Sequence, residues 1–251
     1  MRVLVTFAVD AEFAPWRRMR EFRRKTIANS PAVFYCGTWG DHTIDILLTG
    51  IGLSSCEESL VSYEALQRAR PDCLISSGLA GALKDTLKVG DLVVPERVRT
   101  LKNDANECSD PTLRESATKQ GAAPIETLIT MTRLVSSAEE KSRLAFFGEA
   151  IDMESAVIMA HFRKSAIPAV TIRAISDAAD EDLPIDFDRC LTPQGAIKPL
   201  SLVNAIVRRP SKLPNLVRFG RQSNGAARKL TAFLDQFIAA LSVMREKVAI
   251  V

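Results

Sequence analysis

The segment CLISSGLAGA (residues 73–82) is the most informative part of the chain, because an apolar run passes directly into glycine and alanine. The run at 73–77 predicts a short strand, and the small residues at 78–81 predict a loop beyond it. Ligands of open α/β sheets bind beyond the carboxyl ends of strands. The segment therefore predicts one strand of a central sheet and one wall of a binding site.

Strands and helices are expected to alternate on both sides of this segment. Apolar and β-branched runs predict strands at 3–9, 32–39, 43–49, 92–94, 125–135 and 169–174. Apolar residues at helical spacing predict helices at 54–69, 137–146, 154–162 and 230–244. We expect the polar residues 103–124 to form a surface excursion. This alternation predicts a layered α/β fold.

The overall composition is that of an ordinary globular protein. The 251 residues are 47% hydrophobic and 25% charged, with a net charge of +3, which argues against disorder. Asp10 and Glu12 follow the start too closely for a signal peptide, so we expect a cytoplasmic protein. The five cysteines lack paired spacing, and the two histidines cannot hold a metal without help. We therefore expect no metal and no cofactor.

Basic residues gather in one stretch, 189–234, which holds nine Lys and Arg and no Asp or Glu. Apolar residues accompany the charge, and Pro199, Pro210 and Pro214 predict several short helices. This basic, apolar helical extension suits an anionic membrane surface. A substrate tunnel and a subunit interface are the alternatives. Nucleic-acid binding is not expected, because aromatic residues make up only 6% of the chain.

Polar residues at the predicted strand ends are the candidates for chemistry. Glu12 follows the first strand, and Ser176-Asp177 follows the strand at 169–174. Asp152 and Glu154 precede a predicted helix, where they would either complement the helix dipole or grip a vicinal diol. Each signal alone is explained by a cap or a turn. Together they predict one acidic rim able to admit a ligand.

Three motifs occur in order over about residues 1–182. They are SGLAGA (77–82) followed by LKVGDLVV (87–94), then DMESA (152–156), then RAISD (173–177). In order and spacing they resemble the nucleoside phosphorylase and methylthioadenosine nucleosidase superfamily. The resemblance implies a single domain over 1–251, a three-layer α/β/α sandwich with a mixed, partly closed central sheet. It also implies a homo-oligomer that cleaves the bond between a purine and ribose.

The resemblance also implies roles for nine residues. Asp177 would protonate the leaving purine, Glu12 would activate water, and Arg173 would orient the nucleophile. Two carboxyl groups with opposite tasks suit this reaction. The sugar would be held by Glu154 and Met153. The implied base pocket contains Ala80, Gly81, Val135 and Ser176.

The C-terminal motifs PQG (193–195) and RRPSKLP (208–214) resemble the hopanoid-associated phosphorylase branch of that superfamily. That resemblance implies adenosylhopane, a lipid-linked nucleoside, as substrate, with adenine released at the inner face of the membrane. A soluble methylthioadenosine or adenosylhomocysteine nucleosidase is the rival, and it does not need the basic extension. A non-catalytic nucleotide-binding or membrane-adaptor protein is a further alternative, which the combination of Glu12, Glu154 and Asp177 disfavours.

The choice between hydrolysis and phosphorolysis depends on Glu12. Phosphate capture uses Arg side chains and backbone N–H groups. Where one phosphorylase pattern has an Arg and a Ser, this chain has Ser76 and Leu79. A fixed carboxylate at Glu12 would repel a phosphate dianion, so we expect hydrolysis. Arg17, Arg18 or an Arg of another subunit would be needed to make phosphate the nucleophile.

Overall fold

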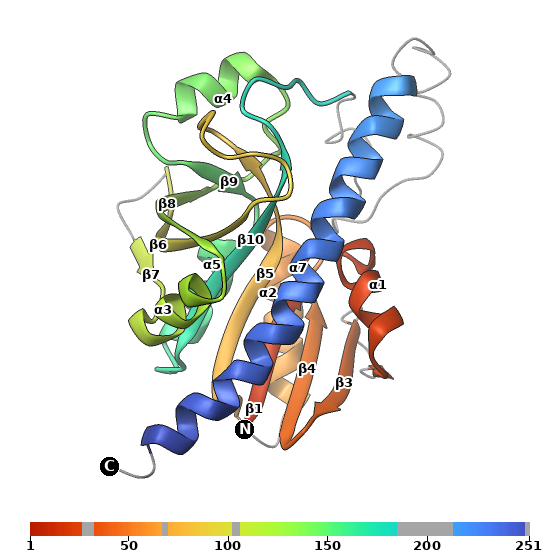
Figure 1. Cartoon of the computed structure of the whole chain (residues 1–251), viewed down its shortest axis with the longest axis vertical. Coiled ribbons are helices and arrows are strands. Elements are labelled where there is room, and N and C mark those ends of the chain that lie inside the picture. Colours follow the sequence, from red (N-terminus) through yellow and green to blue (C-terminus); the bar gives the residue numbers. More distant parts are fainter. Residues whose placement is uncertain (27–32, 67–69, 102–105, 185–212, 249–251) are drawn as a thin grey trace.

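The computed structural model describes residues 1–26, 33–66, 70–101, 106–184 and 213–248 (Figure 1). The strands are β1 (Arg2–Phe7), β2 (Arg23–Thr26), β3 (Val33–Trp39), β4 (His42–Leu48), β5 (Cys73–Ala82), β6 (Leu92–Thr100), β7 (Asn106–Cys108), β8 (Ala123–Thr130), β9 (Ala150–Asp152) and β10 (Ala169–Asp177). The helices are α1 (Asp10–Met19), α2 (Leu53–Leu66), α3 (Pro111–Lys119), α4 (Ala138–Leu144), α5 (Ser155–Arg163) and α7 (Leu213–Val248). Together they form one mixed sheet between two helical layers.

The sheet is closed on one side and open on the other. Neighbouring strands follow the order β10-β6-β8-β9-β5-β1-β4-β3-β2, and β10 pairs with β5 as well. That extra pairing closes a ring of five strands, β5, β10, β6, β8 and β9. The pairs β5–β9 and β6–β10 are antiparallel, whereas β1–β4, β1–β5 and β5–β10 are parallel. The expected mixed, partly closed sheet in a three-layer α/β/α fold is therefore confirmed.

Each face of the sheet is covered by its own helices. Side chains of β1, β5 and β10 pack on one face against α1, α3 and α7. Alternate side chains of the same strands pack on the other face against α2 and α5. Figure 1 shows α7 in front of the sheet and α2 behind it. All nine residues of β10 are buried, as expected for a strand covered on both faces.

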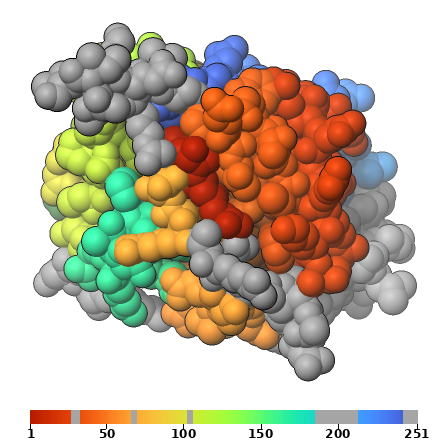
Figure 2. Space-filling view, turned by 90° about the horizontal axis from the view of Figure 1, so that it is seen from below, coloured from red at the N-terminus to blue at the C-terminus, as the bar shows by residue number. Residues whose placement is uncertain are grey.

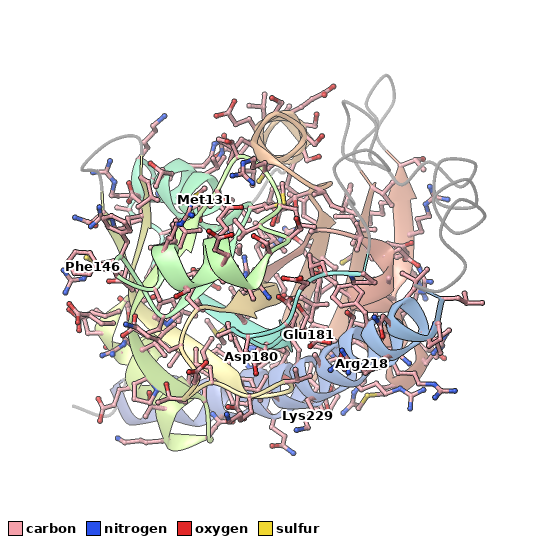
Figure 3. All side chains as sticks on the ribbon, turned by 90° about the horizontal axis from the view of Figure 1, so that it is seen from above. Met131, Phe146, Asp180, Glu181, Arg218 and Lys229 are labelled. Carbon is pink, nitrogen blue, oxygen red and sulfur yellow. The ribbon has the colours of Figure 1, made fainter. Side chains whose placement is uncertain are left out.

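The strands β1, β4, β5 and β10 point the same way, so their amino ends share one face and their carboxyl ends the other. Figure 2 shows the amino-end face, where the red start of the chain lies between orange and yellow segments. Figure 3 looks at the molecule from the opposite side, toward the carboxyl ends. The candidate residues after β1, β5 and β10 therefore lie at one edge of the sheet.

Three expectations were wrong, and two elements were not predicted. Residues 78–81 are not a loop, because β5 continues to Ala82 and pairs Gly81 with both Ile151 and Asp177. Residues 103–124 are not a simple excursion, because they include β7 and α3. The signal for α3 is Asp110, which accepts hydrogen bonds from the N–H groups of Thr112 and Leu113 as its N-cap. The helix α1 and the strand β2, which follow the first strand, were not predicted.

The third wrong expectation concerns the basic stretch. Its described part, from Leu213 onward, lies in one continuous helix of 36 residues rather than in short helices. Pro214 does not interrupt this helix, because it occupies the first turn, where no intrahelical N–H bond is lost. Residues 185–212, with the PQG motif and most of RRPSKLP, lie outside the described residues. Among the described helices, none is long and apolar enough to cross a bilayer.

Candidate active site

Glu12 is a buried carboxylate in the first turn of α1, directly after β1. Its Oε2 accepts hydrogen bonds from the N–H groups of Ala8 at 2.9 Å and Val9 at 3.4 Å. Its Oε1 accepts one from the N–H of Leu79 in β5 at 3.1 Å. Burial raises the pKa of Glu12, and the three N–H groups and nearby Arg173 only partly oppose this shift. Glu12 is thus a fixed carboxylate, and its raised pKa makes it a better proton acceptor than a free Glu.

Arg173 is a fully buried guanidinium in the middle of β10, 1% exposed. Its Nε donates to Asp152 at 3.0 Å. Its Nη1 donates to the carbonyl oxygens of Ser76 at 2.9 Å and Ile172 at 3.2 Å. Its Nη2 donates to the hydroxyl oxygens of Ser155 at 2.7 Å and Ser76 at 3.2 Å. All five N–H donors of the side chain therefore already have partners within the protein.

Glu154 lies between β9 and α5, and its carboxylate is held by the backbone directly before α2. Its Oε1 accepts a hydrogen bond from the N–H of Gly52 at 2.8 Å. Burial, together with the neighbouring carboxylate of Asp152, raises the pKa of Glu154 to about 8. Glu12 and Arg173 are close enough to influence the same group. Glu12, Asp152, Glu154 and Arg173 thus form one buried cluster of charges.

Asp177 ends β10 and belongs to a second group of polar residues. Its Oδ1 accepts a hydrogen bond from the hydroxyl of Ser176 at 2.6 Å. Its Oδ2 lies 2.5 Å from Nζ of Lys141, a lysine of α4 that is fully buried. The register between β10 and β5 shifts between Ile175 and Asp177. Beside this irregularity the Ser176 hydroxyl lies within hydrogen-bond distance of the Ala80 carbonyl oxygen and the Asp177 carboxylate, and bulges are common next to active sites.

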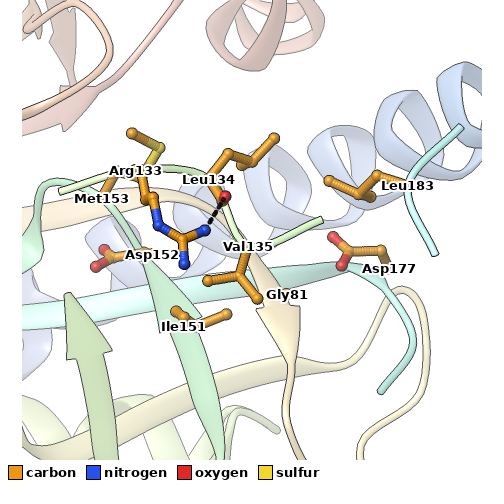
Figure 4. A pocket seen from close by; sticks show the side chains of 9 residues that line it. All are labelled: Gly81, Arg133, Leu134, Val135, Ile151, Asp152, Met153, Asp177 and Leu183. Carbon is orange, nitrogen blue, oxygen red and sulfur yellow. Dashed lines mark hydrogen bonds between the residues drawn. The ribbon is translucent and has the colours of Figure 1, made fainter. Parts of the chain in front are cut away.

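A small hollow adjoins the Asp177 carboxylate (Figure 4). Its lining residues are Gly81, Arg133, Leu134, Val135, Ile151, Asp152, Met153, Asp177 and Leu183. The walls are thus mostly apolar, with a carboxylate at each side. This is the composition expected of a pocket for a flat, weakly polar ligand such as a purine.

The backbone of β5 connects the two polar groups. A Cβ on Gly78 would lie 3.5 Å from atoms of both Glu12 and Arg173. A Cβ on Gly81 would lie 2.9 Å from Oδ2 of Asp177. Three residues of strand span roughly 10 Å. The carboxylates of Glu12 and Asp177 therefore approach β5 at positions three residues apart, and we call this part of β5 the floor of the site.

The nine predicted residues fall into three sets. Gly81, Val135, Met153 and Asp177 line the hollow. Glu12, Arg173 and Glu154 form the charged cluster beside it, and Ser176 bonds to Asp177. Ala80 packs its side chain into the core, and only its carbonyl faces Ser176, at 3.2 Å. Their roles in the reaction stay predictions.

Sequence reasoning missed Lys141, Ile151 and Leu183. Lys141 has a signal in hindsight, because it stands three residues before the buried Leu144 on the same face of α4. A lysine at a core-facing position predicts a buried anionic partner. Leu183 has no comparable signal, since the loop after β10 reaches the hollow only through tertiary contacts.

Comparisons with known proteins identify the family of this chain. The family model of the phosphorylase superfamily matches residues 2–208. A 5′-methylthioadenosine/S-adenosylhomocysteine nucleosidase of Geobacillus sp. is 30% identical over 217 residues, covering 76% of this chain and 91% of the relative. The nucleosidase of the same description from Tolumonas auensis is 28% identical over 218 residues, covering 76% and 92%.

Solved structures show the same fold. The Helicobacter pylori nucleosidase mutant with 5′-methylthioadenosine in its active site superposes with a TM-score of 0.72 at 19% identity, covering 95% of this chain and 98% of that one. The futalosine hydrolase of the same organism gives 0.71 at 18% identity, covering 96% and 99%. The expectation of an enzyme that is an N-ribosyl hydrolase or nucleoside phosphorylase is confirmed. The chain belongs to the phosphorylase superfamily.

Proposed function

We propose that this protein hydrolyses the N-ribosidic bond of an adenosine derivative and releases adenine. The observation that carries the proposal is the position of Glu12, a buried carboxylate across the floor of the site from Asp177. Glu12 takes a proton from water as the water attacks the sugar, and Asp177 supplies a proton to the departing purine. Glu154 accepts hydrogen bonds from the ribose hydroxyls, and Met153 packs against the sugar.

The buried charges match the expected charge of the transition state. Breaking the bond to the purine leaves positive charge on the ribose, which carboxylates stabilise. Glu12 and Glu154 both have raised pKa values, because burial penalises their ionised forms. A developing cation between them relieves that penalty, so the site stabilises the transition state more than the neutral substrate.

Hydrolysis is favoured over phosphorolysis because the hydrogen-bond donors that an incoming phosphate would need already have partners. The N–H groups of Ala8, Val9 and Leu79 are already occupied by the Glu12 carboxylate. All five donors of Arg173 are occupied as well. A phosphate dianion at this place would displace Glu12 or meet its charge at close range. Water needs only the carboxylate.

Adenine release with and without phosphate tests this proposal. We expect adenine and a free sugar in phosphate-free buffer, and we expect Glu12→Gln to reduce turnover by about 10²-fold or more. Asp10→Asn is the matched control, since Asp10 lies on the same helix but is exposed and pairs with Arg17. Turnover that requires added phosphate, with a sugar phosphate as product, would replace the hydrolase by a phosphorylase.

The 5′ substituent of the substrate has two candidates. The relatives act by name on 5′-methylthioadenosine and S-adenosylhomocysteine, and these small substituents are the first choice. The second is the lipid chain of adenosylhopane. It is supported by the start of α7, where Leu213 is 46% and Val217 44% exposed beside Arg218 and Arg221. Apolar side chains next to cations are the pattern expected at an anionic membrane surface.

Rates on both substrates decide between these candidates. A small-molecule nucleosidase should release adenine fastest from 5′-methylthioadenosine, with or without lipid present. An adenosylhopane enzyme should prefer that substrate presented in vesicles. Assembly as a homo-oligomer and a cytoplasmic location stay predictions, which sedimentation and cell fractionation would measure.

A further inference from the structure

Lys141 is a fully buried lysine whose ammonium group has a complete set of partners. Its Nζ donates to Oδ2 of Asp177 at 2.5 Å, to the carbonyl oxygen of Ala178 at 2.8 Å and to that of Glu181 at 2.9 Å. An ammonium group has three N–H donors, and three acceptors surround this one. The geometry is therefore that of a charged ammonium, and not of a neutral amine.

A buried lysine of this kind needs an explanation. Removing the charge from water is costly, and apolar residues of similar size often give equal or better stability than a buried ion pair. The apolar alternative is available here, because the same helix turn places Leu144 in the core cluster beside Val135 and Ile151. The reason for a lysine at this place is its partner Asp177, which is the candidate proton donor.

The two oxygens of Asp177 are held by different donors. Ser176 bonds to Oδ1 and Lys141 to Oδ2, so the carboxylate cannot rotate without breaking one of the two bonds. Across the hollow, Arg133 and Asp152 are the other charged residues that line it. The Glu181 carboxylate is directed instead to Arg218 of α7 (Figure 3). Lys141 is thus the cation in direct contact with Asp177.

Lys141 also holds the loop that follows β10. It bonds the carbonyl oxygens of Ala178 and Glu181, while Asp182 accepts a hydrogen bond from the N–H of Ala138 at the start of α4 at 2.8 Å. This loop carries Leu183 to the wall of the hollow. One side chain therefore connects the candidate proton donor, the loop beyond it and α4.

We propose that Lys141 is a positioning residue of the reaction, which fixes the Asp177 carboxyl group against the purine and holds the loop that follows β10. The inference rests on the proposed function, because it assumes that Asp177 serves the leaving base. A carboxyl group that is held at both oxygens meets the base in one orientation, and this lowers the barrier to proton transfer.

The test compares Lys141→Met, which keeps the length but removes the charge, with Lys141→Arg, which keeps the charge. We expect Lys141→Met to lower kcat by about ten- to a hundredfold, with a smaller change in KM, as for a misplaced catalytic group. A loss in kcat rather than in KM distinguishes a misplaced proton donor from lost substrate binding. Lys141→Arg should restore most of the lost kcat, because a cation still contacts Asp177. The matched control is Arg143→Met on the exposed side of α4.

Two further measurements keep the inference testable if Lys141→Met folds poorly or the substrate is wrong. In an Asp177→Asn background, adding Lys141→Met should cost almost no further activity, since the two residues act as one unit. The carbon-13 signal of the Asp177 carboxyl group should change its chemical shift in Lys141→Met, whether or not adenine is released, because one of its two oxygens loses its partner. An unchanged kcat in folded Lys141→Met and an unchanged carboxyl signal would overturn the inference. Wild-type protein that releases no adenine would overturn only the proposed function.

Discussion

At the scale of single residues, Asp177 carries the most specific prediction. Asp177→Asn keeps the shape of the side chain but removes the proton that the purine needs. We expect a loss of about 10²–10⁴-fold in kcat, the range typical of general acid catalysis. Asp180→Asn, three residues further on and exposed, serves as the control and should stay near wild-type turnover. Near-normal release of adenine by Asp177→Asn would remove Asp177 from the reaction.

Glu154 allows a prediction about stability and pH. Its pKa is raised to about 8 in the folded protein, whereas a free Glu titrates near 4.3. Between these two values the folded state holds a proton that the unfolded state has lost. The contribution of Glu154 to the free energy of unfolding is therefore complete below about pH 4.3 and is lost as pH rises to about 8. One such group changes the free energy of unfolding by at most about 1.4 kcal/mol per pH unit.

Glu154→Gln should remove this decline. Denaturant unfolding at about pH 5 and about pH 8 should show the variant gaining stability relative to wild type as pH rises. The exposed Glu115 on α3, paired with Lys119, provides the control, because Glu115→Gln removes no buried carboxyl group. A stability difference between Glu154→Gln and wild type that is constant with pH would contradict the raised pKa.

At the scale of elements, β5 and α7 respond differently to the same substitution. Gly81→Ala places a Cβ 2.9 Å from Oδ2 of Asp177, closer than real contacts allow, and 3.2 Å from Ile151, which is a tight contact. The carboxylate must shift, and a shift of about 1 Å at a catalytic group can cost about 10²-fold. We expect kcat to fall by about tenfold or more.

Gly225→Ala in α7 is the matched control, because its Cβ would meet no atom within 4 Å. In an exposed helix interior this change should raise the free energy of unfolding by about 0.5–1 kcal/mol and leave turnover unchanged. If both substitutions affect kcat alike, the close approach of β5 to Asp177 is not what matters.

At the scale of the whole molecule, the question is whether the protein binds membranes. Co-sedimentation with anionic vesicles should be strong at low salt and weak at high salt, because exposed charges are screened. Charge reversal at Arg208, Arg209 and Lys212, which lie outside the described residues, should weaken it further. Reversal at the exposed Arg23 and Arg24 of β2 is the control. Equal binding to neutral vesicles, or none at all, would remove the membrane role and leave the small-molecule nucleosidase.

Much of the fold follows from local pattern. The strands β1, β3, β4 and β10 and the helices α2 and α5 were predicted to within a few residues, because burial on one or both faces imposes a period on the sequence. The order of the three motifs was sufficient for the superfamily. The acidic residues Glu12 and Asp177 were noticed at the ends of predicted strands and Glu154 before a predicted helix, whereas their roles came from the family resemblance.

The tertiary structure decided which of these residues touch and what holds them. The second pairing of β10, with β5, closes the sheet and brings Asp177 to Gly81. Lys141 reaches Asp177 across 36 residues of sequence, and Arg173 reaches Ser76 across 97. Periodicity encodes which face of an element is buried, but not which distant side chain lies opposite. That second choice depends on packing between elements, so the ion pair at Asp177 and the occupied donors of Arg173 could be learned only from the folded chain.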